Sequence, residues 1–291
     1  MAEILDGRKV ASEIKTEIAE RVASIKADGQ RVPHVAIILI GDDGASHTYV
    51  KGKITACKKV GFDYTLMQFA ESISEEKLIK HVETLNTDDD IDGFIVQLPL
   101  PAHISVDHVT ERILPVKDVD GFTNQNFGSI VSHNPLLLPA TPYGVMELLS
   151  RYKVETKGKH CVVVGASRLV GAPLSMLLLK QGLATVTVCH KYTEDLNSHT
   201  LKADILISAV GQPGLINAQM VKEGAVVIDV GTTRVEDESK ASGFRIAGDV
   251  LFDEVAPKAS YITPVPGGVG PMTIASLLVN TLKAYENRHL D

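Results

Sequence analysis

Helix patterns and buried-strand patterns alternate along most of this chain, and this alternation constrains the fold more than any other feature. Apolar residues recur at helical spacing at Ile14, Ile18, Val22 and Ile25, and the apolar run VAIILIG follows at 35–41. Two parallel strands of one sheet need a long crossover between them, which is usually a helix. We therefore expect an α/β protein with mainly parallel sheets.

The same patterns divide the chain into two domains. A helix that carries Tyr49 and Lys53 follows the first strand, and further elements are expected at 63–69 (strand), 74–86 (helix) and 93–101 (strand). The periodicity fails between 114 and 141, where Asp, Asn, Gly and Pro are frequent. We expect a first α/β domain over 1–120 and a linker over 121–140.

A second domain is expected over 141–271. Its predicted elements are a helix capped by Thr141 with Pro142 at its first position, a helix at 174–182, and strands at 161–166, 185–190, 203–211 and 225–231. This order is typical of a Rossmann-like, doubly wound nucleotide-binding domain. The last helix, at 273–288, carries one apolar stripe, so residues 272–291 are expected to pack back on the first domain.

Composition argues against several classes of partner. The chain of 291 residues has 36 acidic and 29 basic residues, for a formal charge of −7, and no basic run that could follow a nucleic-acid backbone. No apolar run approaches the roughly 18 residues of a membrane helix, and the N-terminus resembles no targeting segment. The three cysteines form no CxxC pair and the ten histidines form no HxH or HxxxH pair. We expect a cytoplasmic protein without disulfides or a metal site.

The segment VVVGASRLVGAP (162–173) combines a strand, a glycine turn and the start of a helix, which is the setting of a phosphate-binding loop. The G-x-G-x-x-G positions hold Gly165, Ser167 and Val170, and Gly171 is displaced by one. Gly165 permits the tight turn, and the helix N-terminus offers backbone N–H groups to a pyrophosphate. A plain βα turn that needs glycine for its geometry is the alternative.

The tip of the next strand indicates which dinucleotide the second domain takes. NAD-binding folds place an acid there to accept from the ribose hydroxyls, whereas this chain has His190 and Lys191. These side chains, with Arg168 from the glycine turn, are placed to meet a 2′-phosphate, which favours NADP over NAD. A solvated Lys191 is the alternative, because exposed lysines are common.

Tyr49 and Lys53 lie four residues apart on the second expected helix, so their side chains share one face. Such a pair alone more often consists of two solvent-exposed side chains than of part of a functional site. Gln97, however, lies near the C-terminal end of a central strand, where open α/β sheets present ligand-binding residues. Asp120 lies in the acidic loop KDVDG just past that strand, so the four residues together form a candidate site.

Five motifs occur in order across nearly all of the chain: YVKGK, VQLPLP, KDVDG, VVGASRLVGAP and TPVPGGVGPMT (263–273). With them, the chain resembles the bifunctional methylenetetrahydrofolate dehydrogenase/cyclohydrolase family. The resemblance implies NADP-dependent oxidation of 5,10-methylenetetrahydrofolate to 5,10-methenyltetrahydrofolate, and hydrolysis of that product to 10-formyltetrahydrofolate. It also implies tetrahydrofolate derivatives as partners, a homodimer, and a place in one-carbon metabolism and purine biosynthesis.

Carried over residue by residue, the resemblance gives each site its members. It implies that Lys53 is the principal catalytic group, that Tyr49 orients the folate, that Gln97 bonds Lys53, and that Asp120 holds the pterin ring. The implied folate-binding residues are Tyr49, Val96, Gln97, Leu98, Pro99, Asp120, Pro266, Gly267 and Gly268. The implied NADP-binding residues are Thr141, Gly165, Ala166, Ser167, Arg168, His190, Lys191, Ala209, Val210, Gly211, Gly231 and Thr232.

One position departs from the family pattern, since Ala166 stands where many members have arginine, and this removes one candidate contact to the 2′-phosphate. Three matters are open at this point. The first is whether Lys53 acts as a base, an acid or a fixed cation, and the second is whether the chain has both activities or has kept only one of them. The third is whether the chain is a non-catalytic folate or nucleotide sensor, although a protein that only binds its ligand has no need of Lys53 beside Gln97 and Asp120.

Overall fold

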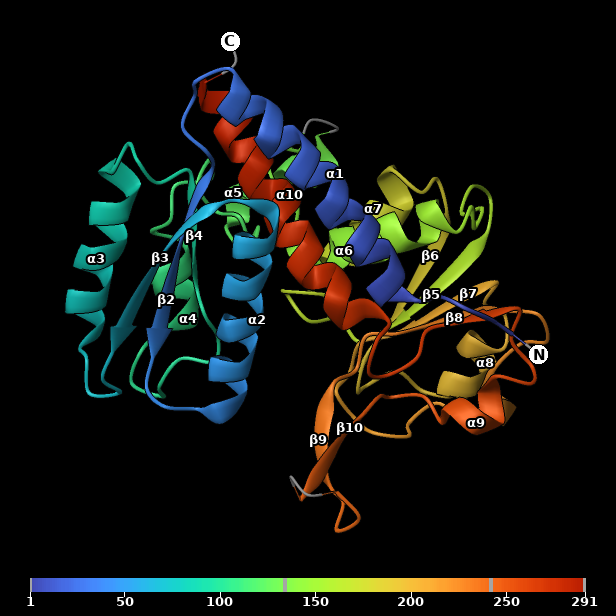
Figure 1. Ribbon diagram of the computed structural model, residues 1–291. Helices are drawn as coiled ribbons and strands as arrows, with labels where there is room; N and C mark the ends of the chain where they lie inside the picture. Colours follow the sequence, from blue (N-terminus) through green and yellow to red (C-terminus); the bar gives the residue numbers. More distant parts are fainter. Residues whose placement is uncertain (1, 133–134, 241–242, 290–291) are drawn as a thin grey trace. The chain divides into compact units, whose positions relative to one another are not determined.

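The structure is a computed structural model that describes residues 2–132, 135–240 and 243–289 (Figure 1). The chain forms two compact units, and each contains a parallel sheet. We call residues 12–140 and 274–291 the three-stranded unit, and residues 1–11 and 141–273 the six-stranded unit. The predicted α/β class with mainly parallel sheets is confirmed.

The sheet of the three-stranded unit has the order β3-β2-β4, and all of its pairs are parallel. Its helix α3 begins directly after Ser74, whose hydroxyl accepts the N–H of Lys77, as the sequence predicts for an N-cap. The strand predicted at 93–101 is shorter and ends at Val96. The elements are α1 (Gly7–Ala27), β2 (His34–Ile40), α2 (Gly44–Val60), β3 (Asp63–Phe69), α3 (Glu75–Thr87), β4 (Gly93–Val96), α4 (Val106–Thr110), α5 (Asn124–Val131) and α10 (Val269–His289).

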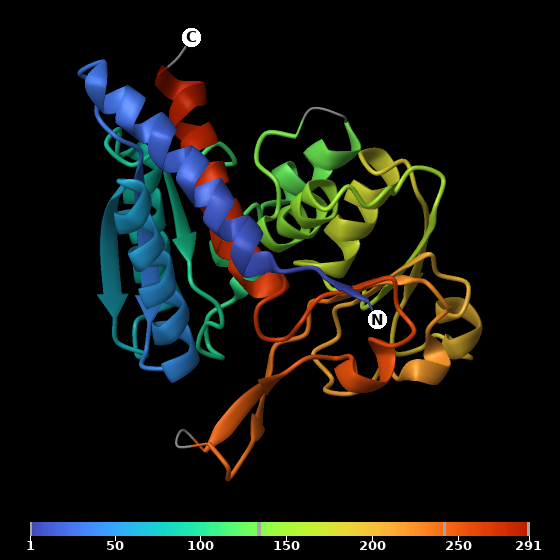
Figure 2. The same ribbon diagram turned by 45° about the vertical axis from the view of Figure 1, so that its right-hand side comes forward.

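Both faces of this sheet are covered, which explains why β2 is an almost uninterrupted apolar run. Ile38 and Ile40 pack in one core with Leu78 and Val82 of α3, whereas α2 contacts β2 and β3. The helices α1 and α10 run side by side in Figures 1 and 2, and the carboxylate of Glu286 on α10 accepts from Arg21 on α1 at 2.7 Å. The two ends of the chain therefore contribute to the same core.

The predicted linker over 121–140 is not an unstructured connection, because it contains α5 and belongs to the three-stranded unit. Thr123 caps this helix by accepting the N–H of Asn126, and Asn126 and Ile130 are buried. The segment NQNFGSIV is too short and too rich in amides to show a helical apolar period. Residues 133–134 of the predicted linker and residues 290–291 lie outside the described residues.

The sheet of the six-stranded unit has the order β1-β11-β8-β7-β5-β6, and its pairs are parallel. The order β6-β5-β7-β8-β11 matches strands 2-1-4-5-6 of the Rossmann arrangement, so the predicted doubly wound sheet is confirmed. The elements are β1 (Glu3–Ile4), α6 (Ala140–Arg151), β5 (His160–Val164), α7 (Gly171–Lys180), β6 (Thr185–Cys189), α8 (Leu196–Thr200), β7 (Ile205–Ser208), η1 (Ala218–Met220), β8 (Val226–Asp229), β9 (Thr233–Glu236), β10 (Phe244–Ala247), α9 (Phe252–Val255) and β11 (Tyr261–Ile262).

The N-terminal residues differ from the predicted domain boundaries. Residues 1–11 were expected in the first domain, but β1 pairs in parallel with β11, with Glu3 opposite Tyr261. A strand of two residues is too short to show a period of two in the sequence. The antiparallel ribbon of β9 and β10, orange in Figures 1 and 2, was also not predicted.

The start of α6 also differs from the prediction. The helix begins at Ala140, so Thr141 is its second residue and not its N-cap, and Pro142 is its third residue. The N–H of Ala140 donates to the carbonyl of Asp120 at 3.1 Å. This first N–H of the helix has no partner within the helix, so the carbonyl takes the place of a capping side chain. Proline is still accommodated, because the N–H groups of the first turn have no partner within the helix.

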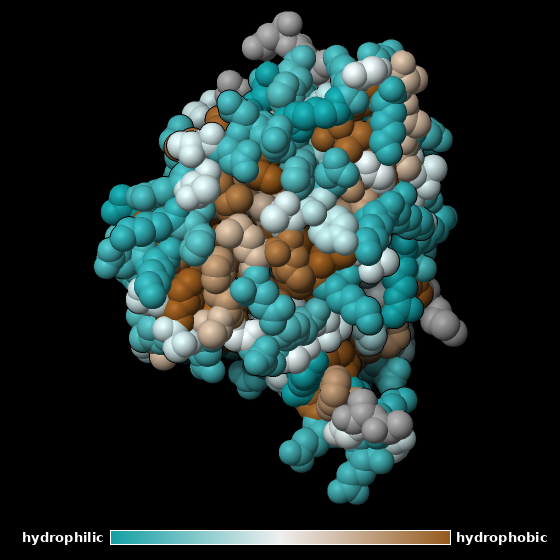
Figure 3. Space-filling model, turned by 60° about the vertical axis from the view of Figure 1, so that its left-hand side comes forward, coloured by the Kyte–Doolittle hydropathy of each residue, from teal (hydrophilic) through white to brown (hydrophobic). Residues whose placement is uncertain are grey.

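Hydrophilic residues predominate on the face of the molecule drawn in Figure 3, and hydrophobic residues show between them. Among the described residues, no helix combines the length and the apolar character that a membrane crossing requires.

An ion cluster at the N-terminal edge of β2 links distant parts of the three-stranded unit. The buried carboxylate of Asp92 accepts from both terminal nitrogens of Arg31 at 2.7 Å and from the backbone N–H of His34 at 2.9 Å. The guanidinium of Arg31 lies over the ring of Tyr285 on α10, 5.3 Å from its centroid. One buried carboxylate therefore joins the start of β2 to the C-terminal helix.

We predict that Asp92→Ala lowers the free energy of unfolding by about 3 kcal/mol, because it leaves Arg31 and the N–H of His34 without their buried acceptor. Urea denaturation followed by circular dichroism measures the change. Asp90→Ala is the matched control, since Asp90 is exposed two residues earlier. Equal denaturation midpoints for the two variants would contradict the prediction.

Candidate active site

Helix α2 presents Lys53 to the interior of the three-stranded unit. Asp43 caps the helix by accepting the N–H of Ser46 at 2.7 Å, and Gly61 ends it in the left-handed conformation. Only 5% of Lys53 is exposed, whereas Tyr49, one turn earlier, is 39% exposed. Burial of a lysine is costly unless its ammonium group has partners, so the neighbours of Lys53 decide what it does.

Two polar side chains meet Lys53. Its Nζ donates to Oε1 of Gln97 at 3.1 Å and lies 3.9 Å from Oδ2 of Asp120. The amide nitrogen of Gln97 donates to the carbonyl of Leu98 at 2.8 Å, which turns the amide oxygen toward the lysine. The sequence prediction that Gln97 bonds Lys53 and that Asp120 lies beside them thus agrees with the geometry.

The other charged residues of the KDVDG motif anchor its loop. Lys117 is buried, and its Nζ donates to the carbonyls of Leu85 and Asp88 at the end of α3. Asp118 accepts the N–H groups of Phe122 at 3.1 Å and Thr123 at 2.8 Å. No local pattern in the sequence predicts these roles, and the only signal is the density of charge in a short loop.

Asp120 is the charged residue of this loop that stays available to a ligand. It is 8% exposed, and among the described residues its carboxylate receives no hydrogen bond; the ammonium of Lys53 at 3.9 Å is beyond hydrogen-bond reach. Burial raises the pKa of Asp120, and the nearby Asp118 raises it further, while Lys53 opposes the shift. The carboxyl group therefore has unused capacity to bind a polar ligand.

The remaining predicted folate-binding residues divide between the two units. Val96 ends β4 and is buried, Leu98 is half-buried, and Pro99 is exposed. Pro266, Gly267 and Gly268 belong to the six-stranded unit, in the turn that precedes α10. The N–H of Arg8 at the start of α1 donates to the carbonyl of Gly267 at 3.1 Å, so this turn is tied to the beginning of the chain.

A pocket of about 560 Å³ lies at the carboxyl ends of β5, β6 and β7 in the six-stranded unit, where doubly wound sheets bind nucleotides. Seven of the predicted NADP-binding residues line it, together with five others. The lining residues are Val164, Gly165, Ala166, Ser167, His190, Lys191, Thr193, Leu196, Ala209, Val210, Gln212 and Leu215. Thr141, Arg168, Gly211, Gly231 and Thr232 are not among them, although Gly211 adjoins the lining residues Val210 and Gln212 in the chain.

In the glycine turn of this pocket, the backbone at two glycines lies too close to neighbouring backbone atoms to leave room for a side chain. Gly165 has φ +115°, and a Cβ there would collide with the carbonyl oxygen of Ala209. A Cβ at Gly171 would collide with the carbonyl oxygen of Gly165, so this glycine lets α7 pack closely on the strand. The displaced glycine therefore does what the third glycine of the G-x-G-x-x-G pattern does.

The charged side of the pocket carries His190 and Lys191, both exposed. The ammonium group of Lys191 lies over the ring of Tyr192, 4.9 Å from its centroid, and the N–H of Tyr192 donates to Nδ1 of His190. None of the described residues that line this pocket is acidic. A glycine turn, a helix N-terminus and two basic side chains fit the phosphates of a dinucleotide.

The doubly wound sheet with its glycine-turn pocket, together with a buried lysine held by an amide and a carboxylate, defines a dinucleotide-dependent enzyme. The comparisons specify the family. The family model of the tetrahydrofolate dehydrogenase/cyclohydrolase catalytic domain matches residues 5–120, and the model of the NAD(P)-binding domain matches residues 139–289. The chain belongs to the tetrahydrofolate dehydrogenase/cyclohydrolase family.

Similar proteins cover almost the whole chain. The bifunctional protein FolD of Cytophaga hutchinsonii is 56% identical over 285 residues, which is 97% of this chain and 98% of that protein. The crystal structure of the bifunctional FolD enzyme from Campylobacter jejuni is 46% identical, with a TM-score of 0.94, covering 99% of this chain and 100% of that chain. The Trypanosoma brucei enzyme, solved with NADP cofactor and an inhibitor, is 41% identical with a TM-score of 0.94, covering 99% and 98%.

We predict that Gly165→Ala weakens binding of NADPH and lowers the melting temperature, because its Cβ displaces the carbonyl of Ala209 in the pocket wall. Fluorescence titration with NADPH and thermal denaturation measure the two effects. Gly128→Ala on α5 is the control, since a Cβ there meets open space and alanine favours a helix. Unchanged affinity in Gly165→Ala would show that the turn tolerates a side chain.

Proposed function

We propose that this chain oxidises 5,10-methylenetetrahydrofolate with NADP+ and hydrolyses the resulting 5,10-methenyltetrahydrofolate to 10-formyltetrahydrofolate. The observation that carries the proposal is the cluster of buried Lys53 and Asp120 with half-buried Gln97 in a chain of this family. A lysine with a purely structural role would make its hydrogen bonds within the protein. In this cluster, the carboxylate of Asp120 lies beside the ammonium group without a hydrogen bond among the described residues.

Each member of the cluster has a distinct task in the proposed reaction. Hydrolysis adds water to the methenyl carbon, so one proton must leave the water as the new carbon–oxygen bond forms. Lys53 is the group that manages this proton or stabilises the developing charge, and Gln97 holds its Nζ at 3.1 Å in one orientation. Asp120, with no hydrogen bond of its own among the described residues, accepts from the N–H groups of the pterin ring.

Tyr49 suits the role of a folate contact. It lies one turn before Lys53 on α2, so both side chains share a face of the helix, and 39% of Tyr49 is exposed. An aromatic ring exposed beside a polar cluster offers a flat apolar surface to a planar ligand. We assign it to orientation of the folate and not to proton transfer.

The pocket of the six-stranded unit is proposed to hold NADP. The glycine turn at Gly165 and the start of α7 suit the pyrophosphate, and His190 with Lys191 suits the 2′-phosphate. The Trypanosoma brucei relative is described in complex with NADP cofactor. When bound, NADP+ supplies the acceptor for the hydride of the dehydrogenase step. The residues of this chain hold and orient it.

We also propose a cytoplasmic homodimer that serves one-carbon metabolism and purine biosynthesis. The family resemblance supports the assembly and the metabolic role. The three cysteines, Cys57, Cys161 and Cys189, are buried and unpaired, as is usual for proteins of a reducing compartment. Burial also raises the pKa of Cys57 and Cys161 to about 12, so these thiols are unreactive.

The test is a spectrophotometric assay of the purified protein with 5,10-methylenetetrahydrofolate and NADP+ or NAD+, followed by 5,10-methenyltetrahydrofolate alone. We predict both activities, and a fall of at least about a hundredfold in each for Lys53→Met, which keeps the length of the side chain but removes its charge. Lys51→Met is the matched control, because Lys51 is exposed on the same helix.

Each result of the assay decides one alternative. Activity in only one assay would reduce the proposal to a single function, and silence in both from folded protein that still binds folate would indicate a sensor. Near wild-type activity of folded Lys53→Met would remove Lys53 from its assigned role.

A second prediction concerns the choice of cofactor. Lys191→Ala is expected to raise the Michaelis constant for NADP+ about tenfold and to leave that for NAD+ nearly unchanged, because only NADP+ carries the 2′-phosphate. Steady-state kinetics with both cofactors measure this, and Lys202→Ala, another exposed lysine, is the control. An equal change for both cofactors would assign Lys191 to the solvated surface.

A further inference from the structure

Two buried carboxylates lie behind the dinucleotide pocket, and the proposed reaction does not use either of them. Asp229 ends β8, and Asp249 lies in the short segment between β10 and α9. Asp249 is fully buried and Asp229 is 3% exposed. Among the described residues, neither carboxylate pairs with a lysine or arginine, and Oδ1 of Asp249 has no hydrogen-bond partner, so the hydrogen bonds of the other three oxygens must offset the cost of burial.

Asp249 binds the backbone of a pocket wall. Its Oδ2 accepts the N–H of Val210 at 2.8 Å, the N–H of Gly211 at 3.3 Å and the hydroxyl of Ser208 at 2.9 Å. Val210 lines the dinucleotide pocket and Gly211 follows it in the chain. The segment that carries Asp249 adds a backbone bond, since the N–H of Ile216 donates to its carbonyl at 2.9 Å.

Asp229 in turn holds Asp249. Its Oδ1 accepts the backbone N–H groups of Gly231 at 2.9 Å and Asp249 at 3.0 Å, and its Oδ2 accepts the N–H of Val250 at 2.9 Å. Burial raises the pKa of Asp229 to about 6, although the N–H groups of Val250 and Asp249 oppose the shift. The carboxylate therefore ties the segment that contains Gly231 to the segment that contains Asp249 and Val250.

Two glycines make this arrangement sterically feasible. A Cβ at Gly248 would collide with the carboxylate of Asp229, and a Cβ at Gly231 would collide with that of Asp249. Gly231 was predicted to touch the cofactor, but it does not line the pocket, and its proximity to Asp249 accounts for a glycine at this position. The absence of side chains here lets two carboxylates reach the backbone.

We propose that Asp249, fixed by Asp229, is a positioning residue for the dinucleotide: its carboxylate holds the backbone at Val210 and Gly211 as a preformed wall of the pocket. The inference rests on the proposed assignment of this pocket to NADP. Asp249 itself lines no part of the pocket and acts through the loop it binds. Preformation matters because a loop that must be ordered on binding lowers affinity.

The decisive variant is Asp249→Ala, which removes the acceptor of three donors. We expect the dissociation constant for NADPH, from fluorescence titration of the full chain, and the Michaelis constant for NADP+ to rise about tenfold or more. Cyclohydrolase turnover of 5,10-methenyltetrahydrofolate, which needs no dinucleotide, should stay within about twofold and report on folding. Asp249→Asn should recover most of the affinity, because its amide oxygen can keep the position of Oδ2.

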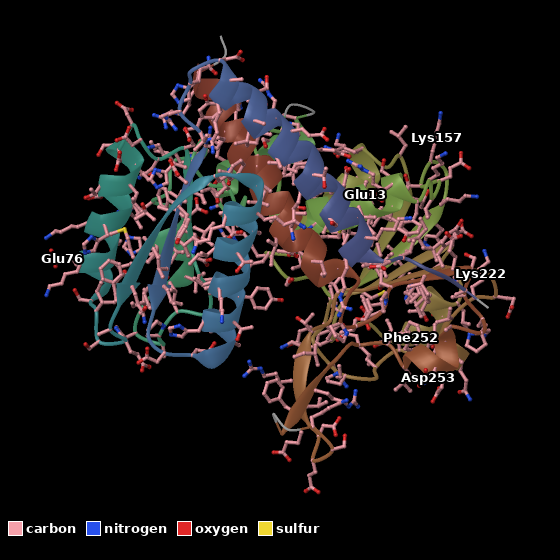
Figure 4. All side chains as sticks on the ribbon, viewed as in Figure 1. Glu13, Glu76, Lys157, Lys222, Phe252 and Asp253 are labelled. Atoms are coloured by element: carbon pink, nitrogen blue, oxygen red, sulfur yellow. The ribbon has the colours of Figure 1, made fainter. Side chains whose placement is uncertain are left out.

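Asp253→Ala is the matched control. Asp253 is exposed on α9, where Figure 4 labels it beside Phe252, and its removal should change no constant. An NADPH affinity of Asp249→Ala within about twofold of wild type would overturn the inference, as would an equal loss of affinity in Asp253→Ala. If wild-type protein binds no NADPH and is inactive, the proposed function fails instead, so the two failures are distinguishable.

Hydrogen exchange of the wild-type protein provides a second test that does not depend on a variant folding. We expect the amides of Val210 and Gly211 to exchange about a hundredfold more slowly than in an unstructured chain even without NADPH, because Asp249 already accepts them. Exchange at unstructured rates until NADPH is added would show that the cofactor forms the wall, and would overturn the inference.

Discussion

In both units, an aspartate binds the N-terminal end of a strand that lies between two parallel neighbours, β2 in one sheet and β5 in the other. Asp92 accepts the N–H of His34 at the start of β2 at 2.9 Å, and Asp204 accepts the N–H of His160 at the start of β5 at 2.9 Å. The same histidines bond a threonine hydroxyl on the neighbouring strand at 2.9 Å, Thr65 in one unit and Thr187 in the other. The strand orders β3-β2-β4 and β6-β5-β7 correspond as well. In each unit, the aspartate thus ties the third strand to the first, and the histidine ties the first strand to the second, so the two residues together hold the register of three strands.

That register determines where the chemistry emerges. Because the strands are parallel, their carboxyl ends lie at one edge of each sheet, and a slip by one residue would reverse every side chain. Gln97 follows β4 at this edge of the three-stranded sheet, while Gly165 and Ala209 follow β5 and β7 at the same edge of the six-stranded sheet. The contacts of Asp92 and Asp204 lie at the opposite, N-terminal edge. Residues that bind ligands at the carboxyl edge, as in other open α/β sheets, therefore lie away from these two aspartates.

The sequence predicted what periodicity and long elements encode. The helices that carry Lys53 and follow Ser74, and the strands β2, β3, β5 and β6, follow from apolar spacing, whereas the bond between Gln97 and Lys53 was implied by the family resemblance. It failed where tertiary contacts decide. Strand β1 exists only because β11 offers an edge, α5 depends on the cap at Thr123 and the burial of Ile130, and Thr141 lies inside α6. Likewise, no local pattern shows that Asp249 would bind the loop after β7.

Neighbouring charged residues of one motif can have different roles, and the hydrogen bonds that each side chain makes within the protein distinguish these roles. In KDVDG, the ammonium group of Lys117 donates to the carbonyls at the end of α3, and the carboxylate of Asp118 accepts backbone N–H groups. Asp120 receives no hydrogen bond among the described residues, although burial raises its pKa. A buried group whose hydrogen bonds are made within the protein stabilises the fold, whereas a buried group without hydrogen bonds carries a desolvation cost that a bound ligand can offset. The same reasoning separates Lys53, whose ammonium group donates to a single side-chain amide, from Lys117, and it supports the proposed roles of Lys53 and Asp120 in the reaction.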